Sequence, residues 1–311
     1  MSSKSCLDMS GMATVTVTFN PDVAVLTAQL ESLSAAALKV VIDNGSDPAI
    51  SAAISDLASK VASVVFVANQ NNMGLGAAIN QGVATVLRIA PQTEFVLLLD
   101  QDSQPQRESV ESLLEAFHQL ESMGRNVGCV GPLLLDTATG FTHGFHQSTR
   151  WRWKRVYPRV DSTALVPCAN LNGSGTLMRA SLFQGLGGLD ERLFIDHLDT
   201  DWSFRITASH HELWGVPKAV FVHKMGNESR RFWLFGWRLW PMRTPQRHYY
   251  LFRNTVLLMR RSYVPFVWKV WAAVKLLVTC VMTLILNPPR GAQLERMWCG
   301  LRHGFSLKTG R

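Results

Sequence analysis

The sequence predicts an α/β fold with a mostly parallel, twisted sheet, helices on both faces of that sheet, and an apolar, basic helical extension at the C-terminus. Two observations lead to this expectation. Over roughly the first 130 residues, short apolar runs alternate with stretches of helical periodicity, which is the pattern of βα units. From about residue 226 onward, the chain instead combines tryptophan, arginine and a long apolar stretch.

The first strand is expected at residues 13–19, ATVTVTF, and Asn20-Pro21-Asp22 ends it. Asp22 is placed to cap a helix over residues 23–36. Apolar runs predict further strands at 38–46, 61–69 and 94–99. A helix is expected near 76–89, after the glycine-rich stretch. In a parallel sheet of this kind, ligands bind at the carboxyl ends of the strands.

The second half of the chain is less regular. Its elements are expected as strands at 129–135, 173–179 and 219–223 and as helices at 181–186 and 199–209. The stretch Tyr263–Leu286 is mostly apolar, but its longest uncharged run, Leu276–Leu286, has only 11 residues. Because a spanning helix needs about 20 apolar residues, we expect an interfacial or re-entrant helix, with a buried core helix as the alternative.

The net charge of +8 indicates a negatively charged partner, which could be nucleic acid, an anionic membrane surface or a phosphorylated substrate. Basic residues gather between His223 and Arg261, where Glu228 is the one acidic residue, and aromatic residues alternate with them. This mixture is typical of an anionic membrane surface, and the apolar stretch beside it disfavours nucleic acid as the partner. The five cysteines are widely spaced without a CxxC pair, which argues against a disulfide framework or a zinc site and favours a reducing compartment.

Four segments carry residues suited to chemistry. Asp100-Gln101-Asp102-Ser103 follows an apolar strand, and two such carboxylates can share a divalent cation that bridges phosphates. His223 also follows a strand and offers a third ligand. The glycine-rich run 72–82 indicates either an anion site at a helix N-terminus or close packing of helix on sheet. The acidic cluster 196–202 lies between apolar residues, which favours a functional role over a solvated helix start.

Together these segments resemble the family 2 inverting glycosyltransferases of GT-A fold and, within them, the bacterial rhamnosyltransferase branch. The resemblance covers roughly residues 13–260. It is carried by the strings VTFNP (17–21), VIDNGS (41–46), NMGLGAAINQG (72–82), LLLDQDS (97–103), GSGTLMR (173–179), LFIDHLDTDWSFR (193–205) and YYLFRN (249–254).

The resemblance implies a pocket for the nucleotide-sugar donor. The residues expected to bind the donor are Thr18, Asn20, Asp43, Asn44, Asn72, Gly74, Asn80, Asp100 and Arg253. Among these, Asp43 would accept a hydrogen bond from the pyrimidine ring, and Arg253 would meet the diphosphate leaving group. Asp102 would be the principal ligand of Mg²⁺ or Mn²⁺, with Asp100 and His223 beside it.

The resemblance also implies a catalytic base. Asp199 aligns with it, and Asp196 and Asp201 would orient the base or the acceptor. The frequent Glu-Asp pair of the family is Leu198-Asp199 in this chain, so the assignment among the three aspartates stays open.

The implied reaction is transfer of L-rhamnose from dTDP-L-rhamnose to a membrane-associated glycolipid, either lipopolysaccharide core or an O-antigen precursor. The enzyme would lie peripherally on the cytoplasmic face of the bacterial inner membrane. We expect a disordered segment at 1–12, the GT-A domain at 13–225 and a membrane-associating helical region at 226–311. The alternatives are rhamnolipid synthesis and, in another class, a basic membrane- or nucleic-acid-binding module without catalysis. A nucleotidyltransferase is disfavoured because no glycine-rich basic signature follows the first strand.

Overall fold

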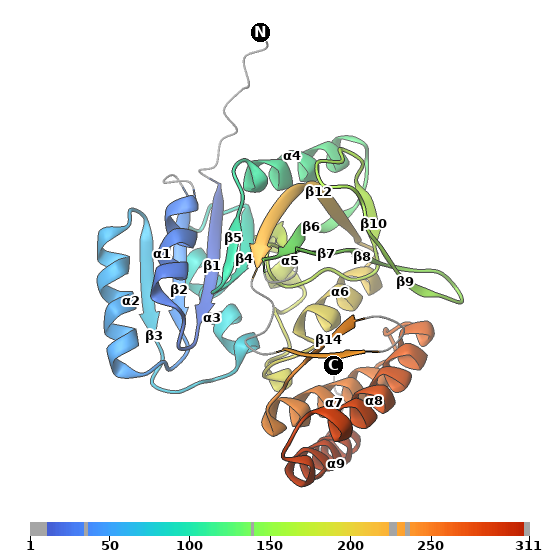
Figure 1. The fold of residues 1–311 in the computed structure, drawn as a ribbon. Coiled ribbons are helices and arrows are strands. Elements are labelled where there is room, and N and C mark those ends of the chain that lie inside the picture. The colour runs from blue at the N-terminus through green and yellow to red at the C-terminus, as the bar shows by residue number, and fades with distance from the viewer. Residues whose placement is uncertain (1–10, 34–36, 138–139, 224–228, 234–236, 308–311) are drawn as a thin grey trace.

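The computed structural model describes residues 11–33, 37–137, 140–223, 229–233 and 237–307 (Figure 1). Residues 1–10 of the expected disordered segment 1–12 lie outside this part, and Met12 already belongs to the first strand. The described residues form a main sheet with the strand order β10-β12-β6-β11-β4-β1-β2-β3, to which β5 and β7 are added beside β12 and β6. The predicted α/β class with a mostly parallel central sheet is confirmed.

The first half of the chain builds the parallel part of the sheet. Its strands are β1 (Met12–Thr18), β2 (Leu38–Asp43), β3 (Val64–Ala68) and β4 (Phe95–Asp100). They pair in parallel as β4-β1-β2-β3 and are connected by α1 (Val23–Ser32), α2 (Pro48–Lys60) and α3 (Leu75–Ile89). The Asp22 carboxylate caps α1 by accepting from the amides of Ala24 and Val25 at 3.0 and 3.4 Å, as predicted.

The second half extends the sheet with mixed directions. β6 (Val127–Asp136) and β12 (Glu212–His223) are parallel, whereas β11 (Leu177–Arg179) is antiparallel to β4 and β6. The strand expected at 173–179 is therefore shorter, because residues 173–176 form a turn in which the Thr176 amide donates to the Gly173 carbonyl at 3.2 Å. The strand expected at 219–223 is the end of β12, which pairs along most of β6.

Short strands surround these long ones. The edge strands are β5 (Ser103–Pro105), β7 (Thr142–His143) and β10 (Val166–Cys168), and a separate hairpin joins β8 (Phe145–Ser148) to β9 (Trp153–Val156). β5 pairs with the end of β12, which places Ser103 opposite His223. This pairing brings the end of β12 back to the end of β4.

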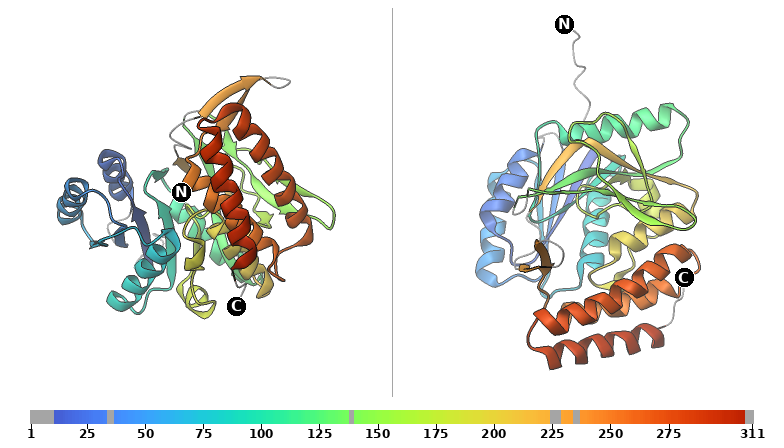
Figure 2. Two further views of the ribbon diagram at one scale, coloured as in Figure 1. Left: turned by 90° about the horizontal axis from the view of Figure 1, so that it is seen from below. Right: turned by 45° about the vertical axis from the view of Figure 1, so that its right-hand side comes forward.

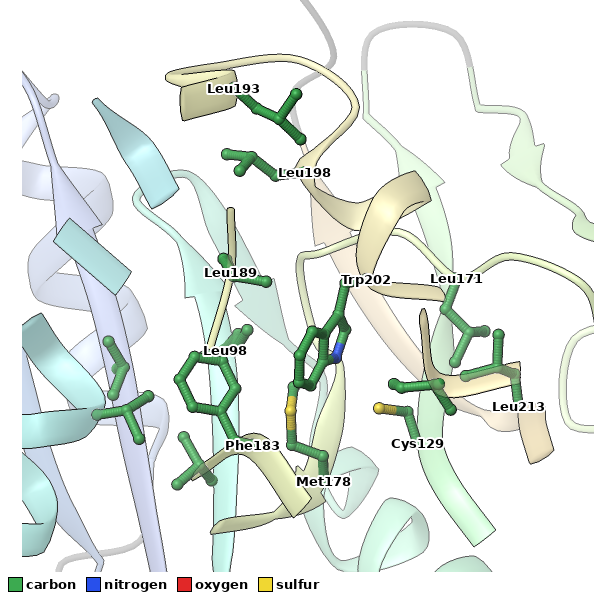
Figure 3. Close-up of a cluster of buried hydrophobic side chains, with 14 of the residues drawn as sticks. Leu98, Cys129, Leu171, Met178, Phe183, Leu189, Leu193, Leu198, Trp202 and Leu213 are labelled. Carbon is green, nitrogen blue, oxygen red and sulfur yellow. The ribbon is translucent and has the colours of Figure 1, made fainter. Parts of the chain in front are cut away.

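Helices cover both faces of the main sheet. α1, α2 and α4 (Ser109–Ser122) contribute to one hydrophobic cluster, and α3, α5 (Ala180–Gly185) and α6 (Leu198–Ala208) contribute to the other. In the second cluster, Phe183 and Trp202 lie 5.1 Å apart between ring centroids, close to Met178 (Figure 3). α3 lies very close to the sheet at Gly82, where an added Cβ would come within 2.3 Å of Val15. The glycine-rich run therefore does include close helix-on-sheet packing.

The C-terminal region contains the hairpin β13 (Ser229–Trp233)–β14 (Trp237–Pro241) and the helices α7 (Pro245–Met259), α8 (Phe266–Leu286) and α9 (Arg290–Ser306). The three helices lie together at one side of the sheet domain (Figure 2). Side chains of α7 and α8, including Leu257 and Trp268, join the same hydrophobic cluster as α6. The position of α6 is thus fixed in part by this region.

α8 differs from a core helix. Within its most apolar window of 18 residues, only 17% are buried, and it is the one helix among the described residues that is long and apolar enough to cross a membrane by length and composition. The alternative of a plain buried helix is therefore wrong. The exposed apolar side chains of α8 and α9 are Phe266, Val270, Trp271, Val274, Leu277, Val278, Val281, Ile285, Leu294, Trp298 and Phe305.

Candidate active site

Asp100, Asp102 and His223 come together where β4, β5 and β12 meet. One ligand atom from each side chain lies within 4.8 Å of the others, which is a suitable arrangement for a divalent cation. Nδ1 of His223 lies 3.2 Å from Oδ1 of Asp102. Carboxylate oxygens suit Mg²⁺ and Mn²⁺, and imidazole is an accepted additional ligand for Mn²⁺. The three predicted metal ligands are therefore adjacent in space.

A buried polar network fixes the turn between Asp100 and Ser103. The amide of Gln29, from α1, donates to the backbone carbonyl of Asp100 at 2.6 Å and also to that of Ser103. Its own carbonyl oxygen accepts from the Thr16 hydroxyl at 3.1 Å. Because Gln29 and Ser103 are fully buried, this network holds the backbone of the turn in place.

Hydroxyl groups connect the turn to His223. The Ser103 hydroxyl lies 3.0 Å from Nδ1 of His223 and also bonds the Ser174 hydroxyl, which in turn accepts from the Asp100 amide at 3.3 Å. Ser174 belongs to the turn before β11. The position of this turn relative to the metal group thus depends on three segments that are far apart in the sequence.

A bound cation would stabilise the ionised carboxylate of Asp100, which its surroundings disfavour. Burial raises its pKa to about 6, and the negative charges of Asp102 and Asp199 act in the same direction. The charge of Arg247 opposes this rise. The Ser174 hydroxyl accepts from the Asp100 amide and its neighbour Gly173 lies beside Asp199, so the metal group and the acidic cluster face the same region of the molecule. This is the convergence that the sequence interpretation required.

Asp199 lies in the first turn of α6, beside the loop that precedes β11. Its Cβ lies 3.8 Å from the position that a Cβ on Gly173 would occupy. Its carboxylate accepts from the Thr200 amide at 2.8 Å. Burial raises the pKa of Asp199, the Thr200 hydrogen bond lowers it, and the charge of Asp196 raises it further. A carboxylate in such a setting is a stronger base than an exposed one.

The loop that leads into α6 has an unusual backbone. Phe194, Asp196 and His197 have φ angles of 63°, 63° and 66°, in the left-handed region that side chains disfavour. α7 holds this loop: the Asn254 amide donates to the carbonyls of Leu193, Ile195 and Asp196 at 2.7, 2.7 and 3.0 Å. Strain of this kind persists only where the surroundings enforce it. The YYLFRN segment therefore positions the acidic cluster.

Two neighbours of Asn254 in α7, Tyr250 and Arg253, contact the same loop. The ring of Tyr250 stacks on that of Phe194 with centroids 4.8 Å apart. The Arg253 guanidinium donates to the carbonyls of Arg192 and Leu193 at 2.6 and 3.0 Å and lies over the Tyr250 ring. Arg253 was expected to meet the diphosphate, but the structure engages its guanidinium with the loop backbone.

Arg247 is the arginine of α7 that lies near the carboxylates. Its guanidinium is 3.3 Å from Oδ1 of Asp196, and its charge lowers the pKa of Asp100. Arg243 is close enough to Asp196 and Arg247 for each to influence its pKa, which burial lowers. The arginine of α7 that lies near the carboxylates is thus six residues before Arg253, the arginine that the sequence interpretation chose.

Asp201 does not face the other carboxylates. It is 1% exposed and pairs with Arg261, which is 5% exposed, and it accepts from the Tyr263 hydroxyl at 2.6 Å. Arg261 also pairs with Asp190. That Asp201 orients the base or the acceptor stays a prediction; in the structure its carboxylate lies in the core and holds α6 against the α7–α8 connection.

The residues expected at the nucleobase lie at the ends of β1 and β2. The Thr18 hydroxyl donates to Oδ1 of Asp43 at 3.2 Å, and Ser46 bonds the same oxygen. Oδ2 of Asp43 is buried and has no hydrogen-bond partner among the described residues. Asn20 links the two strand ends, since its side chain accepts from the Asp47 amide at 2.8 Å. One acceptor oxygen is thus left available at this end of the site.

Asn44 and Asn72 shape the loop before α3. The Asn44 side-chain amide donates to Oδ1 of Asn72 at 3.0 Å, and the same Asn72 oxygen accepts from the Gly74 amide at 2.9 Å. Gly74 has a φ of 89°, and an added Cβ would come within 2.6 Å of Phe194. The glycine therefore allows this loop to contact the one that carries Asp196.

Asn80 lies apart from these groups. Its side-chain amide donates to the Leu189 carbonyl at 3.0 Å and to Glu191 at 2.9 Å, and its oxygen accepts from the Leu189 amide at 2.8 Å. All of its strong hydrogen-bonding positions are therefore used to hold α3 against the 188–191 loop. That Asn80 lines the donor pocket stays a prediction, and the structure adds this role in holding α3.

Comparison with protein families identifies the chain. The family model described as "Glycosyl transferase family 2" matches residues 15–187, which is more than half of the sequence. The chain belongs to glycosyl transferase family 2. The group of Asp100, Asp102 and His223, together with the acidic start of α6, is therefore the candidate active site of a family 2 glycosyltransferase.

Two curated proteins resemble this family 2 glycosyltransferase in sequence. The dTDP-rhamnosyl transferase RfbF of Shigella flexneri is 26% identical over 258 residues, which cover 82% of either chain. The N-acetylglucosaminyl-diphospho-decaprenol L-rhamnosyltransferase of Mycobacterium tuberculosis is 26% identical over 188 residues, which cover 51% of this chain and 58% of that one.

Solved structures support the GT-A fold of the glycosyltransferase. GalNAc-T7 with UDP, GalNAc and Mn²⁺ gives a TM-score of 0.57 at 18% identity, covering 83% of this chain but only 49% of GalNAc-T7. The mannosyltransferase PcManGT from Pyrobaculum calidifontis in complex with GDP-Man and Mn²⁺ gives 0.53 at 15% identity, covering 95% of this chain and 84% of that one. At these identities the likeness concerns the fold.

Sequence reasoning missed two contributors to the glycosyltransferase site. Gln29 was not singled out, although a buried amide in an otherwise apolar helix face is a recognisable signal. Arg247 was passed over in favour of Arg253, and no pattern in the sequence separates the two. Only the docking of α7 shows that Arg247 faces the carboxylates.

Proposed function

We propose that this glycosyltransferase moves L-rhamnose from dTDP-L-rhamnose to a glycolipid acceptor at the cytoplasmic surface of the bacterial inner membrane, with inversion at the anomeric carbon. The observation that carries the proposal is the grouping of Asp100, Asp102 and His223 next to the turn 173–176, whose Ser174 bonds the Asp100 amide and whose Gly173 lies beside Asp199. Support for rhamnose comes from the Shigella flexneri relative, which is a dTDP-rhamnosyl transferase and matches over 82% of either chain.

The donor would lie along the carboxyl ends of the strands. Oδ2 of Asp43, which has no partner among the described residues, would accept from the ring N–H of thymine. Asp100, Asp102 and His223 would hold Mg²⁺ or Mn²⁺, and their ligand atoms are close enough together to do so. When bound, the cation would neutralise charge on the diphosphate as it leaves. Arg247 would add positive charge beside the same group.

Asp199 would act as the general base. The hydroxyl of the acceptor becomes a nucleophile when a carboxylate takes its proton, and the raised pKa of Asp199 favours that transfer. The oxygen then attacks the anomeric carbon on the face opposite the leaving diphosphate, and the bond from that carbon to the diphosphate breaks. Asp196, held by Arg247 at 3.3 Å, would define the acceptor side of the cleft.

The region 226–311 would hold the enzyme on the membrane. α8 and α9 both expose apolar side chains, such as Leu277 and Trp298, with exposed fractions of 68% and 62%. α8 also packs against the protein, since the indole N–H of Trp271 donates to the Trp153 carbonyl at 2.8 Å. This contact supports a helix that lies on the bilayer over one that crosses it. The lipid-linked acceptor is further supported by the Mycobacterium tuberculosis relative, whose name includes diphospho-decaprenol.

A thermal-shift series tests the donor and the metal. Purified protein is heated with dTDP-L-rhamnose, dTDP-D-glucose, UDP-N-acetylglucosamine and GDP-mannose, each with Mn²⁺ or with EDTA. Since a ligand that binds only the folded state stabilises it by mass action, we expect the largest rise in melting temperature for dTDP-L-rhamnose with Mn²⁺.

The matched control is Asp102→Ala, in which the Mn²⁺-dependent part of the shift should disappear. Equal stabilisation of the wild type by all four donors would refute the assignment of dTDP-rhamnose. An unchanged Mn²⁺ effect in Asp102→Ala would refute the metal site.

A further inference from the structure

The β8–β9 hairpin carries the most exposed tryptophan among the side chains that the structure describes. Trp151, in the turn of the hairpin, is 79% exposed, and Phe266 at the start of α8 has the same value. No other large apolar side chain in the described ranges is as exposed as these two. The hairpin forms a small sheet of its own and projects from the sheet domain beside the C-terminal helices (Figure 1).

The base of the hairpin is fixed although its tip is exposed. Phe145 is buried, and the ring of Trp153 lies 6.0 Å from that of Phe204 in α6, between centroids. The indole N–H of Trp271 in α8 donates to the Trp153 carbonyl at 2.8 Å. An isolated two-stranded hairpin is only marginally stable in water, so these contacts hold the tip in a defined position next to α8.

The hairpin and the residues after it are strongly basic. The stretch 148–160 contains five basic residues and no acidic one, and all five are exposed: Arg150, Arg152, Lys154, Arg155 and Arg159. The ion pairs among the described residues include none of these five. The Arg150 guanidinium instead lies over the Trp151 ring, 5.0 Å from its centroid. The tip therefore combines an exposed ring with uncompensated positive charge.

This surface is continuous with the exposed apolar side of α8. Trp271 is 47% exposed although its indole bonds the hairpin, so it belongs to both. Phe266 and Val270, which precede it in α8, are exposed as well. Single exposed apolar side chains are ordinary, whereas a contiguous group of them marks an interaction surface. The tip of the hairpin therefore extends the apolar surface of α8.

The chemistry of this surface favours a lipid bilayer over nucleic acid. Tryptophan rings prefer the depth of the headgroups, and arginine beside them meets the anionic phosphates of lipids. A site for single-stranded nucleic acid uses a basic groove with rings on which bases stack. The adjoining surface of α8 instead exposes aliphatic side chains, including Val274 and Leu277, which suit the acyl region of a bilayer.

We infer that the β8–β9 hairpin is a membrane anchor within the glycosyltransferase domain itself. It places Trp151 among the headgroups of an anionic bilayer, where Arg150 and Arg152 contact lipid phosphates. The inference rests on the membrane contact in the proposed function and extends that contact beyond the region 226–311. The bilayer then holds the enzyme at two elements that are more than a hundred residues apart in the sequence.

Both elements pack against the helix that carries the candidate base. The ring of Phe204 in α6 lies 6.0 Å from that of Trp153 in the hairpin and 5.5 Å from that of Trp268 in α8, between centroids. A bilayer that contacts the hairpin and α8 together therefore fixes the orientation of α6 relative to the membrane surface. Asp199, at the start of α6, is oriented with it.

Binding to lipid vesicles, without donor or acceptor, tests the inference. Co-sedimentation is measured with vesicles of phosphatidylcholine alone and of phosphatidylcholine with phosphatidylglycerol. Trp151→Ser should weaken binding to both by about tenfold, because the indole no longer enters the interface. The double variant Arg150→Gln with Arg152→Gln should weaken binding to the anionic vesicles by about thirtyfold at low salt and leave binding to the neutral ones unchanged. The effect of the arginines should vanish at about 1 M salt, because exposed charges are then screened.

Matched variants separate these effects from general damage. Trp151→Phe keeps an apolar ring and should retain most of the binding. Met123→Ser and Arg107→Gln make comparable changes at exposed positions at the two ends of α4, which lies on the opposite side of the molecule from the C-terminal helices (Figure 1). Both should bind vesicles like the wild type. Circular dichroism melting shows which variants are folded.

The outcomes distinguish this inference from the proposed function. Folded hairpin variants that bind both kinds of vesicle like the wild type overturn the inference, and the proposed function stays intact if Leu277→Glu with Trp298→Glu still reduces binding. Hairpin variants that keep vesicle binding but lose binding to single-stranded RNA, or lose self-association in sedimentation velocity, also overturn it, because the tip then contacts nucleic acid or a second copy. A wild type that binds no anionic vesicles removes the membrane contact of the proposed function and this inference with it, whereas the donor is tested independently by the thermal-shift series.

Discussion

Replacement of Arg261 by methionine separates the structural role of the acidic residues in α6 from the chemical one. Arg261 pairs with both Asp201 and Asp190, and it is 5% exposed, whereas Asp201 is 1% exposed. Methionine keeps much of the volume of the side chain and removes its charge. The variant leaves the Asp201 carboxylate buried without its main cation.

Breaking a buried ion pair from one side costs about 3–5 kcal/mol. Three contacts reduce the cost here. The Tyr263 hydroxyl still donates to Asp201 at 2.6 Å, Arg205 still lies 3.9 Å from it, and Arg192 still pairs with Asp190 at 2.7 Å. We therefore expect a loss of about 3 kcal/mol in the free energy of unfolding, at the lower end of that range.

Urea denaturation followed by tryptophan fluorescence measures this loss. With an m-value of about 3 kcal/mol/M, the midpoint should fall by about 1 M. Arg192→Met is the matched control: its partly exposed ion pair, with 42% of the side chain accessible, should cost less than about 1 kcal/mol. The double variant Arg261→Met with Asp201→Asn should recover part of the stability, because no buried charge is then unpaired.

The reasoning is refuted if Arg261→Met loses less than about 1 kcal/mol. It is also refuted if Asp201→Asn abolishes transfer while its unfolding midpoint stays at the wild-type value. That second result would return Asp201 to the group of residues that contact the reactants.

Three further predictions concern the base and the membrane. Asp199→Asn should reduce transfer by about 10²–10⁴-fold while calorimetry finds dTDP-L-rhamnose affinity nearly unchanged; substantial remaining activity would remove Asp199 as the base. The base works only when ionised, and burial raises the pKa of Asp199, so the rate should fall with decreasing pH at a value above the ordinary aspartate pKa of about 4; an acidic limb at or below that value contradicts the assignment. Leu277→Glu together with Trp298→Glu should reduce co-sedimentation with anionic liposomes, and unchanged binding would place the membrane contact elsewhere.

Much of the sheet could be predicted from the sequence because the strands are continuous apolar runs that end in polar residues. β4 and the turn after it are the clearest case: five buried residues precede Asp100, and the metal group follows directly. The strand expected at 173–179 is longer than the observed β11. Nothing in the polarity of the GSGTLMR segment marks the turn within it, but Gly175, with a φ of 77°, turns the chain there. This turn is stabilised by a contact with another strand: the Leu98 carbonyl of β4 accepts from the Gly175 amide.

The roles of the acidic residues in α6 were only partly predictable. Residues two apart in a helix point about 200° apart, so Asp199 and Asp201 cannot share one face. Asp201 lies on the same face as the buried Leu198 and Phe204, each three positions away, and this spacing places it towards the core. The identity of its partner, Arg261, was not accessible, because that contact spans sixty residues and depends on how α7 and α8 dock.

The same limit explains the arginines of α7. Arg247 and Arg253 are six residues apart and have similar neighbours in the sequence. Which one faces the carboxylates depends on the rotation of α7, and that rotation is set by Gly300 and Gly304 of α9, where an added Cβ would come within 2.5 and 2.7 Å of backbone carbonyls of α7. A contact between two helices that are distant in the chain leaves no signal in a single sequence.

The most direct test of the account is the location of Mn²⁺ in crystals grown with dTDP and MnCl₂. The anomalous difference map should show one peak coordinated by Asp102 and His223 together with diphosphate oxygens, with Asp100 beside it and the Asp199 carboxylate facing the open side of the diphosphate. A nucleotide bound without a peak at these residues, or a peak bound to the nucleotide at a site remote from Asp199, would contradict the proposed active site.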